Sequence, residues 1–194
     1  MRYRFSLGPF HPGWPGPLRF DLEVEDGVVG AAEASLIGLE RTRAEDWASL
    51  TIQEGLRRVE RLCASSSWAY TTAYCQALES LAGLEVPPRG CYLRTLLGEL
   101  ERVSSHLLAG AQVIQLAGLP GAAASLMDLR EEVLQCQQRL TGCRFFPGLN
   151  VPGGLCRDLG DLKALPELVR RVKRPLYRLA HRVVSNRPVV SFLA

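Results

Sequence analysis

The N-terminal part of the chain alternates between apolar and charged positions, as strands do. From Leu18 to Glu25 every second residue is apolar, and a period of two predicts a strand with one face on a core. Asp26-Gly27 then predicts a hairpin turn, because glycine accepts positive φ. The preceding segment from Gly8 to Pro17 is too rich in proline and glycine to pair inside a sheet. We expect a small antiparallel sheet within a β-rich part that covers residues 1–38.

Further along the chain the apolar residues recur at helical spacing. One helix is predicted to begin near Thr51 and to run on until Gly83 ends it. A second helix begins after Pro87-Pro88. Its apolar stripe, from Leu93 to Leu107, places Arg94 on another face.

Two more helices follow in the C-terminal half. The third spans roughly residues 122–140 and ends at Gly142. The fourth spans about 162–184 and is expected to be interrupted near Pro175, because proline removes a helical hydrogen bond. The helices are joined by short connections, which favours antiparallel neighbours.

These elements predict a mainly α (α+β) fold, in which a small N-terminal antiparallel sheet is followed by an antiparallel helical bundle. Residues 1–194 are expected to form a single domain with the bundle over 50–185, since 47% of the residues are hydrophobic and can build a core. Val103 to Met127 contains no charged residue, but Gly118-Leu119-Pro120-Gly121 breaks it. We therefore predict two buried helix segments there and no membrane span.

Charge and cysteine content exclude several classes of function. Lys and Arg total 23 against 20 Asp and Glu, interleaved along most of the chain, so nucleic acid is not required as a partner. The basic segment from Val169 to Arg187 is interpreted as a solvated helix face. The six cysteines form no Cys-x-x-Cys pair, which argues against an ordinary structural zinc site. The N-terminus has no apolar signal segment, so we expect a reducing compartment and free thiols.

His11 is the candidate catalytic residue. It lies in a Gly-Pro-x-His-Pro segment that its prolines stiffen. A rigid loop presents an imidazole well, and a neutral histidine can donate a hydrogen bond to a carbonyl such as a quinone oxygen, or pass a proton at physiological pH. The alternative is that His11 only caps backbone groups of its own loop.

Cys63 is the candidate thiol. It is predicted to be helical, with Arg61 beside it to favour the thiolate and hence metal binding or redox chemistry. Nickel or iron needs several converging soft ligands, however, and no second cysteine lies within a helical turn of Cys63. We predict no metal site on this chain. A buried structural thiol is the alternative for each cysteine.

Gly153 and Gly154 form the third candidate, just after Pro152. Two adjacent glycines allow the backbone to approach a ligand closely, so the pair is a candidate wall of a binding cleft. An equal alternative is a turn between helices in which Asp158 caps the next element. The pair lacks the strand, the spacing and the helix start of a dinucleotide-binding fingerprint.

Taken in order, these segments closely resemble one family over nearly the whole chain: the D subunit of respiratory complex I and the large subunit of energy-converting nickel-iron hydrogenases. The most specific segment is Tyr92-Leu93-Arg94-Thr95-Leu96-Leu97-Gly98-Glu99-Leu100-Glu101-Arg102-Val103-Ser104-Ser105-His106-Leu107-Leu108. The other segments are Gly8-Pro9-Phe10-His11-Pro12, Leu18-Arg19-Phe20, Val59-Glu60-Arg61-Leu62-Cys63, Ala73-Tyr74-Cys75-Gln76-Ala77-Leu78-Glu79, Leu140-Thr141-Gly142 and Gly153-Gly154-Leu155-Cys156-Arg157-Asp158.

The resemblance implies roles for some of these residues. In the complex I branch the histidine that matches His11 is implicated in binding the quinone headgroup. In the hydrogenase branch two cysteines of this region ligate the nickel-iron centre, and Cys63 matches the first whereas Ser66 stands at the second. The family's second cysteine pair has no counterpart in a chain that stops at Ala194. A hydroxyl is a poor soft ligand, so we expect no nickel-iron site.

Other functional positions of the family also differ. Ala64 stands where the complex I branch has a tyrosine thought to contact quinone, and Glu40-Arg41-Thr42 stand where the family has His-x-Gly. The helix-packing positions are kept. This pattern is typical of a degenerate scaffold protein.

The resemblance therefore implies a subunit-like component of a membrane-associated NADH:quinone oxidoreductase or of an energy-converting hydrogenase-type complex. Its implied activity is electron transfer towards a quinone-like acceptor, and its implied neighbour is an iron-sulfur small subunit. A cleft near His11, Cys63, Gly153 and Gly154 would face the cluster of that subunit. These four residues are the expected cofactor-binding residues, although the chain itself is expected to bind no metal and no other cofactor. A non-catalytic scaffold or assembly protein and the N-terminal piece of a split large subunit are the alternatives.

The resemblance also implies a location and a set of partners. The chain is expected to be cytoplasmic and peripheral on the inner face of the cell membrane, with other complex subunits as partners and only indirect contact with the membrane. Alone, it is expected to be inactive.

Overall fold

The structure is a computed structural model that describes residues 1–11, 17–36, 47–187 and 191. It divides into two compact units, Met1–Leu50 and Thr51–Ala194, and each is described by itself. The boundary lies between the β-rich part and the helical part that the sequence predicts. That residues 1–194 form a single domain stays a prediction.

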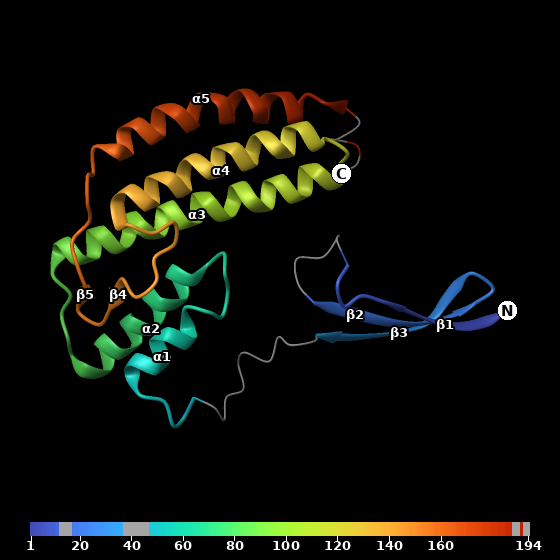
Figure 1. Ribbon diagram of the computed structural model, residues 1–194, viewed down its shortest axis with the longest axis horizontal. Helices are drawn as coiled ribbons and strands as arrows, with labels where there is room; N and C mark the ends of the chain where they lie inside the picture. The colour runs from blue at the N-terminus through green and yellow to red at the C-terminus, as the bar shows by residue number, and fades with distance from the viewer. Residues whose placement is uncertain (12–16, 37–46, 188–190, 192–194) are drawn as a thin grey trace. The chain divides into compact units, whose positions relative to one another are not determined.

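The first unit contains the predicted antiparallel sheet. Its strands are β1 (Arg2–Leu7), β2 (Leu18–Glu25) and β3 (Val28–Leu36), in the order β1-β2-β3 (Figure 1). Asp26 and Gly27 have φ of 49° and 82°, so the predicted hairpin turn is confirmed.

The two faces of this sheet differ in chemistry. On one face the carboxylates of β2 pair with cations, since Glu23 accepts from Arg2 and Arg4, and Asp21 accepts from Arg19. On the other face the apolar residues of β2 lie opposite those of β1, as in the pair of Phe5 and Leu22. The alternation along β2 therefore sorts charged from apolar side chains.

The second unit begins with two short helices where the sequence predicted one. These are α1 (Ile52–Val59) and α2 (Ser67–Ala82). Thr51 caps α1 in a capping box with Glu54, and Gly83 ends α2 in the left-handed conformation with φ 61°. The prediction of one continuous helix is wrong because the chain leaves helical geometry between Glu60 and Ser66, where serine hydroxyls compete for local hydrogen bonds.

The long helices are α3 (Pro88–Leu116), α4 (Pro120–Thr141) and α5 (Ala164–Val184). Proline stands at the start of α3 and of α4, where its missing N–H costs nothing. The turn at Gly118 separates the two, which confirms that the uncharged stretch forms two helices. Within the described ranges, none of the helices is both long and apolar enough to span a membrane.

Helix α5 differs from its prediction because it continues through Pro175. Proline removes one hydrogen bond, to the carbonyl of Arg171, but α5 packs against α4 along its length. Leu168, Val172 and Leu179 are buried on both sides of the proline. Tertiary packing therefore holds the helix together where local propensity disfavours it.

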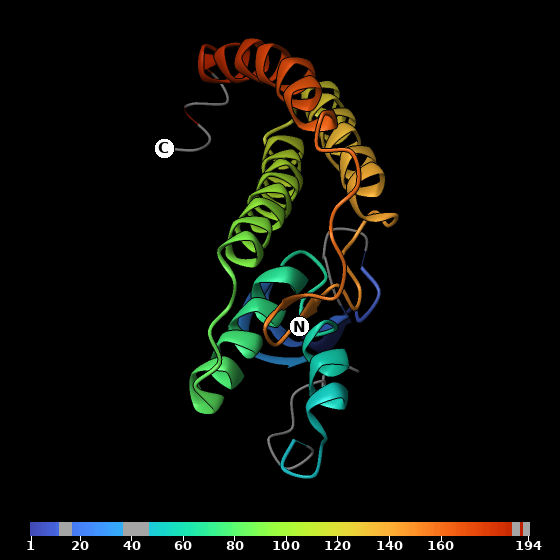
Figure 2. The same ribbon diagram turned by 90° about the vertical axis from the view of Figure 1, so that its left-hand side faces the viewer.

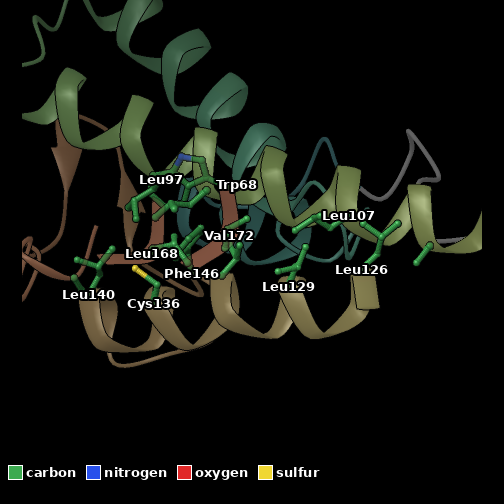
Figure 3. Packing of buried hydrophobic residues seen from close by; sticks show 14 of the residues in the cluster. Trp68, Leu97, Leu107, Leu126, Leu129, Cys136, Leu140, Phe146, Leu168 and Val172 are labelled. Atoms are coloured by element: carbon green, nitrogen blue, oxygen red, sulfur yellow. The ribbon is translucent and has the colours of Figure 1, made fainter. Parts of the chain in front are cut away.

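Helix α4 lies between α3 and α5, and it packs against both (Figures 1 and 2). Figure 3 shows the core that they enclose, with Leu97, Cys136, Leu140 and Leu168 brought together. Trp68 of α2 joins this core edge-on to Phe146, with ring centroids 5.2 Å apart. The predicted fold class, a small sheet followed by a mainly helical part, is confirmed.

In the chain, a short hairpin follows α4 and precedes α5. It pairs β4 (Asn150–Val151) with β5 (Gly154–Leu155) across Pro152 and Gly153. Gly90 of α3 approaches this hairpin so closely that a Cβ atom there would stand 3.5 Å from the Cα of Gly154. The hairpin therefore rests on the N-terminal end of α3.

Candidate functional site

His11 is exposed in the loop that follows β1. Residues 12–16 of this loop lie outside the described residues, as do Glu40, Arg41 and Thr42. His11 belongs to the first unit, whereas Cys63, Gly153 and Gly154 belong to the second. Its catalytic role stays a prediction.

Cys63 lies in the loop between α1 and α2, so the prediction that it is helical is wrong. Its side chain is half-buried, and its Sγ lies 3.3 Å from the Oγ of Ser65. The pKa of the Cys63 thiol is lowered, first by this hydrogen bond and further by Ser66, while burial acts in the opposite direction. The sequence attributes thiolate character to Arg61, and the structure supplies serine hydroxyls as the leading cause.

The residues that follow Cys63 line a small cavity of about 20 Å³, which has room for one water-sized molecule. Its wall includes Ser65, Ser67, Glu101, Arg130 and Gln137. The Nε of Arg130 is buried and has no hydrogen-bond partner among the residues that the structure describes.

Glu101 reaches this cavity from α3 and caps the start of α2. Its two carboxylate oxygens accept from the backbone N–H groups of Trp68 at 2.7 Å and Ala69 at 3.0 Å. These donors would otherwise be orphaned at the end of the helix. Burial raises the pKa of Glu101, and the two N–H groups oppose that rise.

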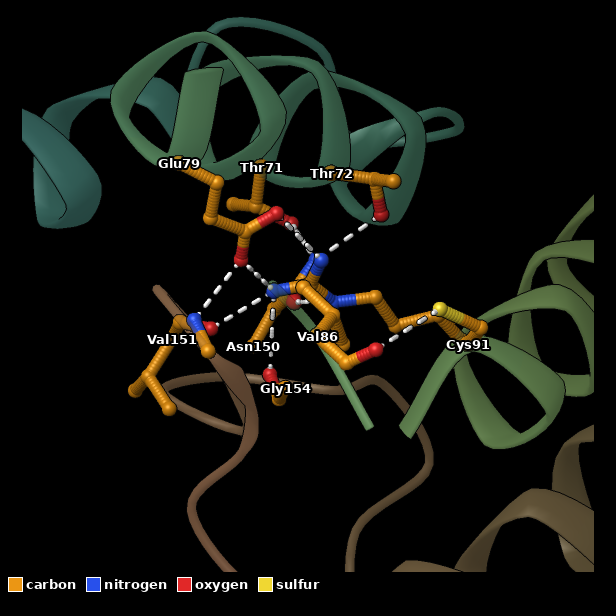
Figure 4. Close-up of polar contacts among 10 residues, drawn as sticks. Thr71, Thr72, Glu79, Val86, Cys91, Asn150, Val151 and Gly154 are labelled. Carbon is orange, nitrogen blue, oxygen red and sulfur yellow. Dashed lines mark hydrogen bonds and ion pairs between the residues drawn. The ribbon is translucent and has the colours of Figure 1, made fainter. Parts of the chain in front are cut away.

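A buried ion pair forms the polar centre of the second unit (Figure 4). The guanidinium of Arg94 donates from Nη1 and Nη2 to the two carboxylate oxygens of Glu79, at 2.9 and 2.6 Å. Both side chains are 6% exposed. The hydrogen bonds from Arg94 lower the pKa of Glu79, against the effect of burial.

The β4–β5 hairpin completes the shell around this pair. Arg94 donates to Asn150 Oδ1 at 2.8 Å, to the carbonyl of Val151 at 2.6 Å and to that of Gly154 at 3.2 Å. In return the backbone N–H of Gly153 donates to Glu79 at 2.7 Å. Every nitrogen of the guanidinium is thus engaged, so Arg94 is a structural tie between α2, α3 and the hairpin.

Gly153 and Gly154 are predicted to let their backbone approach another group closely. In the structure that group is the ion pair of Arg94 and Glu79. Their φ values of 91° and 137° are left-handed, which an L side chain rarely adopts. The approach brings their polar groups to Arg94 and Glu79. The alternative interpretation, in which Asp158 caps the next element, is wrong, because α5 begins at Ala164 and has no side-chain cap. Asp158 instead accepts from the backbone N–H of Leu159 and pairs with Arg89. A cofactor-binding role for the two glycines stays a prediction.

The sequence places Arg94 off the apolar stripe and so predicts that its side chain is exposed. That prediction is wrong, because the Arg94 side chain is buried. Its partners Glu79 and Asn150 lie 15 and 56 residues away, so no local pattern signals the pair. Glu101 and Arg130 are missed for the same reason. In the absence of a partner, a charged residue on a helix is assigned to solvent.

The donor set does not fit a nickel-iron centre. Within residues 1–11, 17–36, 47–187 and 191, no three side chains of His, Cys, Asp or Glu are grouped so that they would hold a metal ion. Cys63 has a serine hydroxyl as its near neighbour, and a hydroxyl is a poor ligand for a soft metal. No step of a reaction is therefore assigned to such a centre in this chain.

Known proteins resemble this chain in sequence and in fold. The chain is 32% identical over 160 residues to the D subunit of NADH-quinone oxidoreductase from Chromobacterium violaceum, a match that covers 82% of the chain. The chain is a homologue of the NADH-quinone oxidoreductase D subunit. The D subunit of Albidiferax ferrireducens is likewise 32% identical, over 174 residues and 88% of the chain. No protein-family model matches.

The match covers less than half the length of each of these D subunits. The chain spans 38% and 42% of these two relatives. Among solved structures, a chain of the membrane-bound sulfane sulfur reductase, an archaeal respiratory membrane complex, matches with a TM-score of 0.85. That match has 24% identity and covers 99% of this chain and 52% of the other, so it supports the fold.

Proposed function

We propose that this chain is a component of a membrane-associated NADH:quinone oxidoreductase or energy-converting hydrogenase-type complex. In it the chain contributes to electron transfer towards a quinone-like acceptor, beside an iron-sulfur small subunit and other subunits. The observation that carries the proposal is the 32% identity to the D subunit over 82% of the chain.

His11 is proposed as the residue that contacts the acceptor. A neutral imidazole donates a hydrogen bond to a quinone carbonyl and can deliver a proton as the oxygen gains charge. His11 is exposed in its loop, so it is accessible to such a ligand. In this proposal the electrons come from the iron-sulfur cluster of the partner, since such a cluster needs several converging thiolates and the described residues hold no metal-binding group of three or more His, Cys, Asp or Glu.

Cys63, Gly153 and Gly154 are proposed to belong to the surface that faces the partner's cluster. Cys63 offers a half-buried thiol with a lowered pKa next to the small cavity that Ala64 and Ser65 line. The two glycines offer a backbone that Arg94 and Glu79 hold in one conformation. A fixed backbone lets a partner surface approach closely without a cost in ordering a loop.

We also propose that the chain is cytoplasmic and attached to the inner face of the cell membrane through the complex. Its relatives are NADH-quinone oxidoreductase subunits, and the fold matches a chain of a respiratory membrane complex.

A scaffold or assembly role, or that of one piece of a split large subunit, is the second candidate. The observation that favours it is chemical: Ala64 and Ser66 stand where the resemblance implies a tyrosine and a cysteine of the family, while the helices pack around a buried apolar core. A scaffold needs the packing surfaces of the family and none of its ligands. A gene for the remaining part of the large subunit beside this one would favour the split enzyme.

The test is to isolate the complex by a tag on this chain, from cells that produce it, and to measure NADH-dependent reduction of a short-chain ubiquinone. We expect an iron-sulfur protein to copurify. His11→Ala should lower the turnover about tenfold, as expected when a hydrogen bond worth about 1.4 kcal/mol is lost. His181→Ala is the matched control, because His181 is an exposed histidine at the end of α5.

Each result decides between the candidates. An intact complex that turns over equally well with His11→Ala would contradict the role of His11 at the acceptor and favour the second candidate. A chain that purifies with no iron-sulfur protein would contradict both the enzyme component and the scaffold.

A further inference from the structure

The net positive charge of the chain is concentrated in helix α5. This helix is the outermost of the three long ones, because α4 lies between it and α3 (Figure 1). It contains six arginines and lysines and one glutamate, an excess of +5, whereas the whole chain has a net charge of +3. The remainder of the chain is therefore slightly acidic, and α5 is its basic element.

Four exposed arginines form a row along α5. Each is four residues from the next: Arg170, Arg174, Arg178 and Arg182. Residues four apart on a helix lie on nearly the same face, so the row is about 18 Å long. Arg174 stands two residues after the buried Val172, about 200° round the helix from it. The row therefore faces away from the core.

The stability of the helix does not explain this row. Like charges four residues apart on a helix repel one another. None of the four arginines forms an ion pair with the residues that the structure describes, whereas Arg171 beside them is paired with Glu132 and Glu167. The helix dipole favours cations over the last turn, which includes only Arg182 of the row. The other three arginines weaken the helix unless anions face them.

The side chains around the row fit the headgroup region of a membrane. The planar guanidinium of an arginine donates to two phosphate oxygens at once. Tyr177 is 68% exposed and shares a surface hollow of about 570 Å³ with Lys173, Arg174 and Arg178. An exposed tyrosine ring beside cations is typical of the boundary between lipid and water.

The geometry of the row favours a lipid surface over an acidic protein segment. A row on one face of one helix can meet a plane along its whole length. A protein segment would need carboxylates at matching positions, whereas an anionic bilayer presents phosphates in any register. Every cation held near such a bilayer adds to the attraction, so a row of four makes a contact that needs no insertion of the helix.

We propose that the arginine row of α5 binds the headgroups of anionic phospholipids, so that this helix lies along a membrane surface. The sequence interprets this face as solvated and implies only indirect contact with the membrane, and the proposal adds a direct contact. It rests on the proposed function, which brings the chain to the membrane through its complex.

Vesicle binding by the purified 194-residue chain measures this contact. Protein that sediments with vesicles of phosphatidylcholine and phosphatidylglycerol in equal parts is compared with protein that sediments with phosphatidylcholine alone. We expect at least about tenfold tighter binding to the anionic vesicles, and loss of that binding at high salt, which screens the charges. Equal binding to the two kinds of vesicle, or binding to neither, would overturn the proposal.

An alternating charge reversal separates lipid binding from helix stability. Arg170→Glu combined with Arg178→Glu turns the row into alternating carboxylates and guanidiniums four residues apart, an arrangement that strengthens a helix. The variant should keep or raise the unfolding midpoint, and it should bind the anionic vesicles at least about tenfold more weakly.

The matched control reverses two exposed arginines of other helices. Arg57→Glu in α1 combined with Arg139→Glu in α4 changes the net charge by the same amount. It should leave vesicle binding within about twofold of the wild type. If both double variants weakened binding equally, the net charge of the chain and not the row would attract the vesicles. Circular dichroism of each variant verifies that the helices are retained.

Photocrosslinking in cells identifies what lies against the row in the assembled protein. Tyr177 is replaced by the photoreactive residue benzoylphenylalanine, and the product is analysed by mass spectrometry. We expect a phospholipid adduct at this position, and none from the same replacement of Ala124, which is exposed on α4. A crosslink from position 177 to an acidic protein segment, to a nucleic acid or to a second copy, or the lack of a lipid adduct, would overturn the proposal.

The proposed function is read separately, from quinone reduction by the isolated complex in detergent. Arg170→Glu combined with Arg178→Glu should retain that activity, because α5 carries none of the residues proposed to contact the acceptor. A wild-type chain that binds no anionic vesicles, although its complex reduces quinone, would remove this inference alone. A chain that binds them as expected, in a complex that reduces no quinone, would keep this inference and remove the enzymatic role.

Discussion

Arg94 and Glu79 meet as a bidentate ion pair in the middle of the helical unit, each only 6% exposed. The pair joins α3 to α2, and through Asn150 and Gly153 it holds the β4–β5 hairpin against both. A buried ion pair is not by itself strong evidence of stability, but removal of one partner leaves an uncompensated charge in the interior. Replacing one of the two residues is therefore expected to destabilise the fold more than replacing both with apolar residues.

Arg94→Met is expected to destabilise the protein by about 3–5 kcal/mol, because the Glu79 carboxylate would stay buried without its cation. Urea unfolding followed by circular dichroism measures the change. Arg102→Met, which removes the exposed pair with Glu99, is the matched control and should cost less than about 1 kcal/mol. The double variant Arg94→Met/Glu79→Leu should recover part of the loss. Equal effects of the two arginine variants would show that the buried pair does not tie the unit together.

Acid should weaken the fold through Glu131. Its hydrogen bonds from Arg144 lower the pKa of the Glu131 carboxyl to about 2. A depressed pKa in the folded state stabilises the protein above the ordinary pKa of 4.5, and that contribution is lost as the pH falls towards 2. Glu131→Gln should therefore lower the unfolding midpoint at pH 7 and match the wild type at pH 2. Glu85→Gln, at an exposed loop position, should have the unfolding midpoint of the wild type at both pH 7 and pH 2.

Cys63 should react faster with iodoacetamide than Cys75 does. The Cys63 thiol is half-buried with a lowered pKa, whereas burial raises the pKa of Cys75 to about 11. Alkylation rates for each cysteine peptide at pH 7.5, read by mass spectrometry, measure the difference. Ser65→Ala removes the hydrogen bond to the thiol and should slow Cys63 alone. If Cys63 kept its rate in this variant, the serine would not be what favours the thiolate.

Gly160 should not tolerate a side chain. A Cβ atom there would stand 3.0 Å from the carbonyl oxygen of Arg139 and 3.3 Å from that of Leu140, and a backbone oxygen at the end of α4 cannot easily move. Gly160→Ala is expected to cost about 1–3 kcal/mol in urea unfolding. Gly121→Ala, where nothing lies within 4 Å, is the control and should be neutral or stabilise α4 slightly. Identical midpoints for both variants would refute this close contact.

The sequence predicts the features that a few neighbouring residues determine. Asp26-Gly27 forms its turn, Pro87-Pro88 precedes α3, and Gly118 ends it, because each acts through its own backbone angles. Two predictions of helix continuity failed, one through local side-chain hydrogen bonds and one through tertiary packing. The chain breaks at Cys63, where Ser65 and Ser66 bond the thiol, and α5 passes Pro175 because α4 supports it.

The candidate site was predictable only in outline. The resemblance to the complex I family was recognisable from ordered motifs, and His11, Cys63, Gly153 and Gly154 came from those motifs. The burial of Arg94 and the cap that Glu101 gives to α2 depend on contacts between residues 15 to 56 positions apart. A charge pattern read along one helix does not show them, because the partner lies on another helix.

The tight turn between α3 and α4 also determines an order of events during synthesis on the ribosome. Only Ala117, Gly118 and Leu119 separate the two helices, so they can pair soon after both have emerged. The guanidinium of Arg94 must wait for Asn150 and Gly154, up to 60 residues further along. It therefore stays hydrated in the nascent chain and gives up its water late, when the hairpin folds over it.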